Sequence, residues 1–129
     1  MSVAIHPGRI VFALIPYLAC STAIPLIIEI TQPYSASKGG IISMIKAIAV
    51  EHARYGIRAN TILPGWIATD MTTINQNNQK FTDKVISRVP MRRWGEPKDF
   101  CGIAAYLASD ASAYHSGDMF IVDGGYAIF

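Results

Sequence analysis

Residues 34–40 read Tyr34-Ser35-Ala36-Ser37-Lys38-Gly39-Gly40. If this stretch is helical, its spacing of four residues places Tyr34 and Lys38 one turn apart on the same face. An ammonium beside a phenol favours the phenolate and lowers the tyrosine pKa from its ordinary value of about 10. Such a tyrosine can exchange a proton with an alcohol oxygen near neutral pH. The alternative, which the spacing alone favours, is a surface tyrosine and a solvated lysine on an ordinary helix.

The sequence around this stretch predicts one long helix. Residues 34–55 follow a helical pattern, and Gly56 suits the left-handed residue that ends a helix. One face is formed by larger and mostly apolar residues, namely Ile41, Ile45, Ile48, Ala49 and His52. A second stripe carries small residues that allow close helix contact, namely Ala36, Gly40, Ser43 and Ala47.

Segments of strand and helix alternate along the rest of the chain. We expect strands at residues 10–15, 57–63 and 119–122, the second of them stopped by Pro64-Gly65, and a helix from Pro97 to about Ala108. Residues 69–90 are polar and rich in Asn and Gln, with a short helix at about 80–89. This order predicts an α/β domain with a parallel sheet and right-handed crossovers.

The motif at Tyr34 and Lys38 resembles the active-site motif of the short-chain dehydrogenase/reductase family. Further blocks of the same resemblance follow in family order: Tyr55-Gly56-Ile57-Arg58-Ala59-Asn60, Leu63-Pro64-Gly65-Trp66-Ile67-Ala68-Thr69, Pro90-Met91-Arg92-Arg93-Trp94-Gly95-Glu96-Pro97, Ser116-Gly117-Asp118 and Val122-Asp123-Gly124-Gly125. They span nearly all of residues 34–129. The resemblance implies a three-layer, Rossmann-type fold that binds NAD or NADP and interconverts alcohols and carbonyls.

The chain departs from the family pattern in its first third. It contains no Gly-rich strand–turn–helix fingerprint for a pyrophosphate, so we expect a partial Rossmann-type fold that lacks the N-terminal dinucleotide-binding half. Residues 1–33 diverge from the family. Counting back from Tyr34 places the family's catalytic serine at Ser21, whereas the strand that begins near Gly8 would place it at Leu14 or Ile15. An insertion or an altered reading frame in residues 12–33 would explain this disagreement.

Composition limits the classes of protein to which the chain can belong. A length of 129 residues suits a single domain, 1–129, and 51% of the residues are hydrophobic. The net charge of +2 argues against a nucleic-acid partner. Cys20 and Cys101 form no CxxC or metal-binding spacing, which favours a reducing, cytoplasmic setting and no metal site. His6, His52 and His115 are isolated in sequence and read as structural residues rather than ligands.

Residues 10–28 carry no charge and are long enough to suggest a membrane span or signal segment. Pro16 and Pro25 would interrupt a single helix there. Buried parallel strands also read as continuous apolar runs. We therefore favour a buried strand from Ile10 to Ile15 and no association with a membrane.

The resemblance implies a role for each matching residue. Tyr34 would act as general acid or base, Lys38 would lower the tyrosine pKa and bind the nicotinamide ribose, and Ser21 would polarise the substrate carbonyl. The residues of the next block that would bind the cofactor are Pro64, Gly65, Ile67 and Thr69. Residues 69–95 would form a lid over a small alcohol or carbonyl substrate.

Two functions remain open on the sequence. One is an NAD(P)-dependent oxidoreductase that interconverts a secondary alcohol and a ketone. The other is a truncated, inactive remnant that retains the fold and an oligomer surface. Both lead us to expect a homo-oligomer, a dimer or tetramer, because the low charged fraction of 16% and the small-residue stripe favour self-association.

Overall fold

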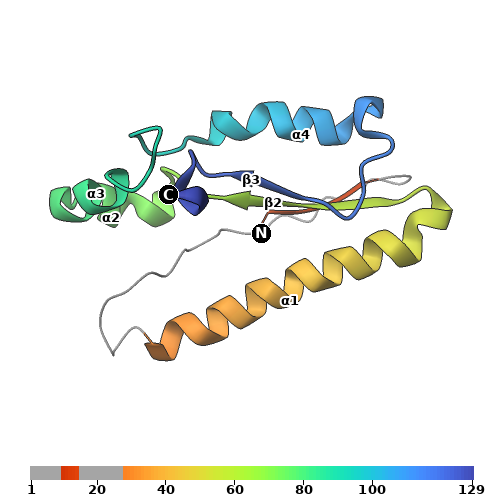
Figure 1. The fold of residues 1–129 in the computed structure, drawn as a ribbon, viewed down its shortest axis with the longest axis horizontal. Helices are drawn as coiled ribbons and strands as arrows, with labels where there is room; N and C mark the ends of the chain where they lie inside the picture. Colours follow the sequence, from red (N-terminus) through yellow and green to blue (C-terminus); the bar gives the residue numbers. More distant parts are fainter. Residues whose placement is uncertain (1–9, 15–27) are drawn as a thin grey trace.

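The computed structural model describes residues 10–14 and 28–129 of the chain (Figure 1). Its strands are β1 (Ile10–Leu14), β2 (Arg58–Pro64) and β3 (Met119–Val122). Its α-helices are α1 (Ile28–His52), α2 (Thr73–Gln76), α3 (Gln79–Ile86) and α4 (Cys101–Ala108). Short 3-10 helices are η1 (Ala53–Tyr55), η2 (Asp70–Thr72), η3 (Pro97–Phe100), η4 (Asp110–Ser112) and η5 (Tyr126–Ile128).

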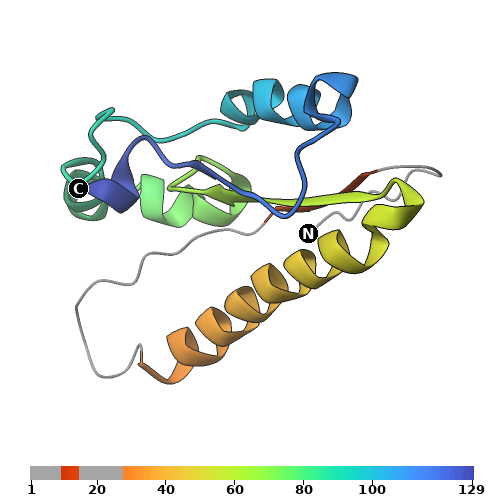
Figure 2. The ribbon, with the colours of Figure 1, turned by 45° about the vertical axis from the view of Figure 1, so that its right-hand side comes forward.

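The three strands form one parallel sheet in the order β1-β2-β3. Ile10 is aligned with Arg58 between the first pair of strands, and Thr61 with Met119 between the second. Helix α1 lies on one face of the sheet and α4 on the other, so the chain forms three layers (Figures 1 and 2). This arrangement confirms the predicted α/β class, the parallel sheet and the three-layer architecture.

Helix α1 packs on β2 through the predicted apolar face. Ile45 and Ala49 are 2% and 6% exposed and form a core cluster with Ala59 and Leu63 of β2. After η1 the chain turns at Gly56, whose φ of 73° is left-handed and whose N–H donates to the carbonyl of Ala53. The predicted helix end at Gly56 is thus confirmed, with a 3-10 turn before it.

The start of α1 differs from the prediction, because the helix begins at Ile28 rather than Tyr34 and contains Pro33. A proline lacks the N–H that would donate to the preceding turn. Pro33 is the sixth residue of α1, beyond the first four N–H groups that have no partner within the helix, so the helix loses one bond there and continues. Pro33 therefore does not mark the helix boundary.

The segment after β2 is more regular than its polar composition suggests. It contains η2, α2 and α3, which agrees with the short helix predicted near residues 80–89. Val85 and Val89 are buried against Tyr126 of η5, with Phe81 and Trp66 around them. Residues 69–95 are therefore anchored to the end of the chain, and a lid function for them stays a prediction.

The layer formed by α4 is tied to the sheet by polar contacts from β2. The Arg58 guanidinium donates from Nη1 to the Ser112 carbonyl at 2.7 Å and from Nη2 to the Leu107 carbonyl at 3.1 Å. Leu107 and Ser112 are buried. Among the helices within residues 28–129, none is long and apolar enough to cross a membrane.

Candidate active site at the carboxyl edge of the sheet

The first turns of α1 lie toward the end of the molecule at which the parallel strands finish. Helix α1 leads through η1 into β2, so the two elements run in opposite directions (Figure 1). The helix is closest to the sheet at its C-terminal end and furthest from it at its N-terminal end (Figures 1 and 2). In open α/β sheets, ligands bind outside the carboxyl ends of the strands.

Tyr34 and Lys38 share one face of α1, as their spacing predicts. The Lys38 ammonium lies over the Tyr34 ring, with Nζ 5.1 Å from the ring centroid. Both side chains are half-buried. An ammonium over an aromatic face is attracted by the ring quadrupole.

The pKa of Tyr34 moves in the opposite direction to the one predicted. Burial raises it above its ordinary value, because removal from water disfavours the phenolate. The expectation that Lys38 lowers the Tyr34 pKa is wrong for this arrangement. The Lys38 ammonium contacts the ring face, and burial sets the direction of the pKa change.

The segment after β2 is fixed by contact with the end of β3. The Gly65 N–H donates to the Val122 carbonyl at 3.0 Å. A Cβ at position 65 would lie 2.6 Å from Cα of Asp123, closer than real Cβ atoms approach other atoms. Gly65 is therefore needed where β2 and β3 end side by side, whether or not it also contacts a cofactor.

Ile67 and Thr69 are held in place from two directions. The Ala68 N–H donates to the Gly95 carbonyl at 2.8 Å, and the Gly95 N–H donates to the Trp66 carbonyl at 2.8 Å. The Thr72 hydroxyl donates to the Ile67 carbonyl at 2.8 Å and accepts from the Thr69 N–H at 2.9 Å. Thr69 thus caps η2 and is exposed at the carboxyl edge.

A pocket of about 390 Å³ opens beside this segment. Its lining comes from the ends of β2 and β3 and from the turn before η3, namely Trp66, Ile67, Met91, Arg93, Gly95, Asp99, Ile121, Val122, Asp123, Gly124 and Gly125. Ile67 is the one predicted site residue among them, and neither Tyr34 nor Lys38 lines the pocket. The structure therefore places the predicted residues in two groups, Tyr34 and Lys38 on α1, and Pro64, Gly65, Ile67 and Thr69 at and beyond the end of β2.

Trp66 organises this edge and is not among the site residues predicted from the sequence. Its indole ring makes edge contacts with Phe81, Trp94 and Tyr126 at centroid distances of 5.6, 5.9 and 6.4 Å. These four residues form an aromatic cluster that joins α3 to η5. The position of Trp66 directly after Pro64-Gly65 was a usable signal, since that turn is where the sheet opens to ligands.

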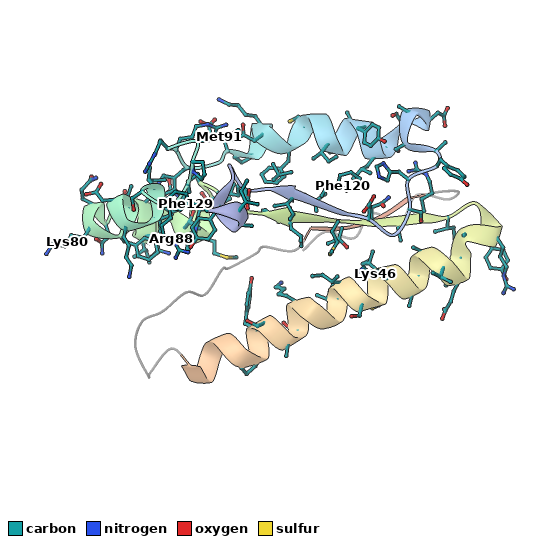
Figure 3. The ribbon with its side chains drawn as sticks, viewed as in Figure 1. Lys46, Lys80, Arg88, Met91, Phe120 and Phe129 are labelled. Atoms are coloured by element: carbon teal, nitrogen blue, oxygen red, sulfur yellow. The ribbon has the colours of Figure 1, made fainter. Side chains whose placement is uncertain are left out.

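The arginines near the pocket are each engaged by the chain itself. Arg88 lies over the Tyr126 ring, with Cζ 4.9 Å from the centroid. Arg92 donates from Nη1 to the Ser87 carbonyl. The Arg93 guanidinium donates to both Asp99 carboxylate oxygens, at 2.7 and 2.9 Å, and this contact, with a hydrogen bond from the Glu96 N–H, lowers the pKa of Asp99 to about 2. Figure 3 shows Arg88, Met91 and Phe129 gathered at this end of the molecule.

Two further predictions concern residues outside this edge. Ser21 lies outside the described residues. In the part of the chain that is described, no three His, Cys, Asp or Glu side chains come together in a way that could hold a metal ion. His115 bonds to Tyr106 and Asp118, which agrees with a structural role.

Comparisons with known proteins identify the family of the chain. The family model described as enoyl-(acyl carrier protein) reductase matches residues 15–127. A 2-dehydro-3-deoxy-D-gluconate 5-dehydrogenase from Pseudoalteromonas atlantica is 43% identical over 98 residues, which cover 75% of this chain and 39% of that protein. A 5-keto-D-gluconate 5-reductase from Escherichia coli K12 is 38% identical over 106 residues, which cover 82% of this chain and 42% of that protein.

The solved structures give the same result. The crystal structure of a gluconate 5-dehydrogenase from Burkholderia cenocepacia J2315, in complex with NADP and tartrate, superposes with a TM-score of 0.72 at 37% identity. The match covers 75% of this chain and 38% of that one. The chain therefore spans about two fifths of the length of these relatives. Since the family model matches most of its residues, the chain belongs to the short-chain dehydrogenase/reductase family.

Proposed function

We propose that the protein containing this chain is an NAD(P)-dependent oxidoreductase that interconverts a secondary alcohol and a ketone. The observation that carries the proposal is the Tyr34–Lys38 pair, which lies on the first turns of α1 toward the carboxyl edge of a parallel sheet. A phenol and an ammonium on one helix face can transfer a proton and orient a hydroxylated ligand. The family membership supports this function over an ordinary surface pair.

The described residues fit one end of a nicotinamide dinucleotide. Ile67 and Thr69 are held rigidly beyond the end of β2, where the backbone can meet a planar amide group. Lys38 offers three donors to a ribose hydroxyl. Residues 1–129 contain no glycine-rich phosphate loop, so the fit concerns the nicotinamide end alone.

The cofactor, when bound, supplies the hydride chemistry. Tyr34 donates its proton to the carbonyl oxygen in reduction and accepts a proton in oxidation. Burial raises its pKa, which keeps the phenol protonated at neutral pH and suits it first to the role of acid. Lys38 keeps the phenol ring oriented from above and binds the ribose. Ser21 would hold the substrate oxygen, and Pro64, Gly65, Ile67 and Thr69 would seat the nicotinamide.

The substrate class that we propose is a polyol or a sugar acid. Relatives of this chain are named for gluconate derivatives and for D-arabinitol. Such substrates carry several hydroxyl groups, and one secondary hydroxyl is oxidised to a ketone. The cytoplasmic setting predicted from the two cysteines stays a prediction.

The test is an assay of nicotinamide reduction by the complete protein that contains this chain, with gluconate and arabinitol as substrates. Tyr34→Phe removes only the transferable proton and should lower turnover by at least about 100-fold. Tyr114→Phe is the matched control, because Tyr114 is fully exposed and lies at the opposite edge. Equal rates for the two variants would remove Tyr34 from the mechanism.

The competing interpretation is a remnant that keeps the fold without chemistry. It predicts that neither substrate nor cofactor is turned over in the unsubstituted protein, whatever residue occupies position 34. A measurement of cofactor binding adds to the turnover assay. A protein that binds the cofactor but turns over no substrate lacks a catalytic group. Absence of both would favour the remnant.

We further propose that the protein is a homo-oligomer that uses the outer face of α1. The small residues Ala36, Gly40, Ser43 and Ala47 are all exposed, and Met44 is 50% exposed beside them. Small side chains let two helices approach closely, and a two-fold axis is the commonest symmetry of such contacts. Light scattering coupled to size exclusion should show a dimer or tetramer. Ser43→Arg should shift the population toward the monomer.

A further inference from the structure

One side-chain hydroxyl bonds to two of the predicted site residues beyond the end of β2. Oγ1 of Thr72, the last residue of η2, donates to the Ile67 carbonyl at 2.8 Å and accepts from the Thr69 N–H at 2.9 Å. It also accepts from Nε2 of Gln76, the last residue of α2, at 2.8 Å. A hydroxyl has one hydrogen to donate and two lone pairs that accept. These three contacts therefore use its full hydrogen-bonding capacity.

The direction of the Ile67 peptide groups explains why a partner is needed on the side of Thr72. Ile67 forms an isolated parallel bridge with Gly95, whose N–H donates to the Trp66 carbonyl and whose carbonyl accepts from the Ala68 N–H. The bridge thus uses groups of the residues on either side of Ile67, and the N–H and carbonyl of Ile67 itself point to the opposite side. The Thr72 hydroxyl is the group that meets this carbonyl.

A capping role accounts for only part of this arrangement. Thr69 is the N-cap of η2, and the Thr72 side chain bonds back to the N-cap backbone, as in a capping box. A capping box requires no contact with Ile67 or Gln76. Both of these contacts are partly buried, and loss of the hydroxyl would deprive the Ile67 carbonyl of its bond and the Gln76 amide of the shorter of its two bonds.

Gln76 connects the same hydroxyl to the helices that follow. The Gln76 carbonyl accepts from the hydroxyl of Thr82, which belongs to α3, at 3.1 Å. Helix α3 in turn packs through Val85 against Tyr126 of η5. Through Thr72, the residues beyond the end of β2 are therefore linked to α2 and α3, which lie in the segment that the sequence predicts to be a lid.

We propose that Thr72 is a positioning residue for the nicotinamide end of the cofactor, which sets the conformation of Ile67 and Thr69 and links it to the position of α2. This inference rests on the proposed function, because Ile67 and Thr69 are among the residues that would seat the nicotinamide. Thr72 itself acts through them. A segment that is already held in its bound conformation loses less conformational entropy when a ligand binds, so the hydroxyl strengthens cofactor binding.

The test compares the complete protein that contains this chain with its Thr72→Val and Thr72→Ser variants. Valine keeps the shape of threonine without the hydroxyl, and serine keeps the hydroxyl without the methyl group. We expect Thr72→Val to weaken the binding of NAD(H) or NADP(H) by about five- to tenfold in calorimetric titration. The KM for the cofactor should rise in the same proportion, whereas kcat should change by less than about twofold. Thr72→Ser should retain most of the unsubstituted affinity.

Hydrogen exchange gives a readout that needs no cofactor. In the ligand-free protein, the Thr69 amide should exchange at least about tenfold faster in Thr72→Val than in the unsubstituted form, because its acceptor has been removed. Mass spectrometry resolved to single residues measures this rate. Thr82→Val is the matched control, since the Thr82 hydroxyl bonds to two carbonyls of the same segment rather than to Ile67 or Thr69. It should change neither the exchange of the Thr69 amide nor the affinity for the cofactor.

The possible outcomes separate this inference from the proposed function. If the unsubstituted protein binds a cofactor, an unchanged affinity or an unchanged Thr69 exchange rate in Thr72→Val would overturn the positioning role and leave the oxidoreductase proposal standing. Equal losses in Thr82→Val would assign the effect to general loosening of the segment and would also overturn it. An unsubstituted protein that binds neither cofactor would overturn the proposed function and, with it, the role of Thr72 in cofactor binding.

Discussion

The segment after β2 and the first turns of α1 both lie toward the carboxyl edge of the sheet, but they are positioned by different means. The segment after β2 is held by backbone contacts with Val122 and Gly95, and its aromatic cluster joins α3 to η5. The first turns of α1 lie where the helix has moved away from the sheet (Figure 2). The half of the site that would seat a cofactor is thus built by tight packing, whereas the half that would transfer a proton is carried by one helix.

The largest effect should come from substituting a lysine of α1, which tests the residues that would transfer the proton. In the complete protein, Lys38→Met should lower turnover by about 10²- to 10⁴-fold and weaken cofactor binding, because it removes the ammonium that lies over the Tyr34 ring and that we propose binds the ribose. Lys46→Met is the control, since Lys46 is exposed on the same helix (Figure 3). Steady-state kinetics measure both variants. Equal losses would mean that Lys38 contributes only to the helix surface.

Cofactor binding by residues 1–129 alone tests whether the segment after β2 is sufficient to bind a nicotinamide dinucleotide. We expect a dissociation constant for NAD(H) or NADP(H) weaker than about 1 mM, because the chain contains no glycine-rich loop to bind the pyrophosphate. Calorimetric titration with both cofactors provides the measurement. Micromolar affinity for either would reveal a nucleotide site that the motifs do not indicate.

A pair of glycine substitutions tests the close packing between the ends of β2 and β3. Gly65→Ala should lower the free energy of unfolding by about 1–3 kcal/mol, because the new methyl group would overlap Cα of Asp123. Gly102→Ala is the control, because no atom lies within 4 Å of its new Cβ. Within α4 that change should raise stability by up to about 1 kcal/mol. Chemical denaturation of both variants gives the comparison, and a stable Gly65→Ala protein would mean that β2 and β3 separate readily.

Removal of the Arg93–Asp99 ion pair beside the pocket should have the smallest effect on stability, and only within a defined pH range. The Asp99 carboxyl accepts from Arg93 and from the Glu96 N–H, which lowers its pKa to about 2. Its contribution to stability is therefore present above the unfolded carboxyl pKa of about 4 and is lost as the pH falls toward 2. Thermal unfolding across this range should show a shallower decline for Asp99→Asn than for the unsubstituted chain. Parallel curves would mean that the pair adds nothing in solution.

Most of the elements could be predicted from the sequence because their signals are local. The apolar face of α1 at Ile45 and Ala49, the left-handed Gly56 and the strand at Met119–Val122 each follow from a short pattern. The parallel direction of the strands follows from alternating strands and helices. The early start of α1 could not be predicted in this way, because a proline ordinarily interrupts a helix, whereas α1 continues through Pro33.

The sequence by itself determined the residue types of the candidate site, since Tyr34 and Lys38 need only one helical turn to share a face. The tertiary structure alone decided the surroundings of the predicted site residues in both groups. It showed that burial raises the Tyr34 pKa, that Gly65 is required by Asp123, and that Trp66 joins α3 to η5. The physical reason is the separation in sequence between the residues that interact. Spacing of a few residues specifies a helix face, whereas desolvation and close packing arise from residues that the fold alone brings together.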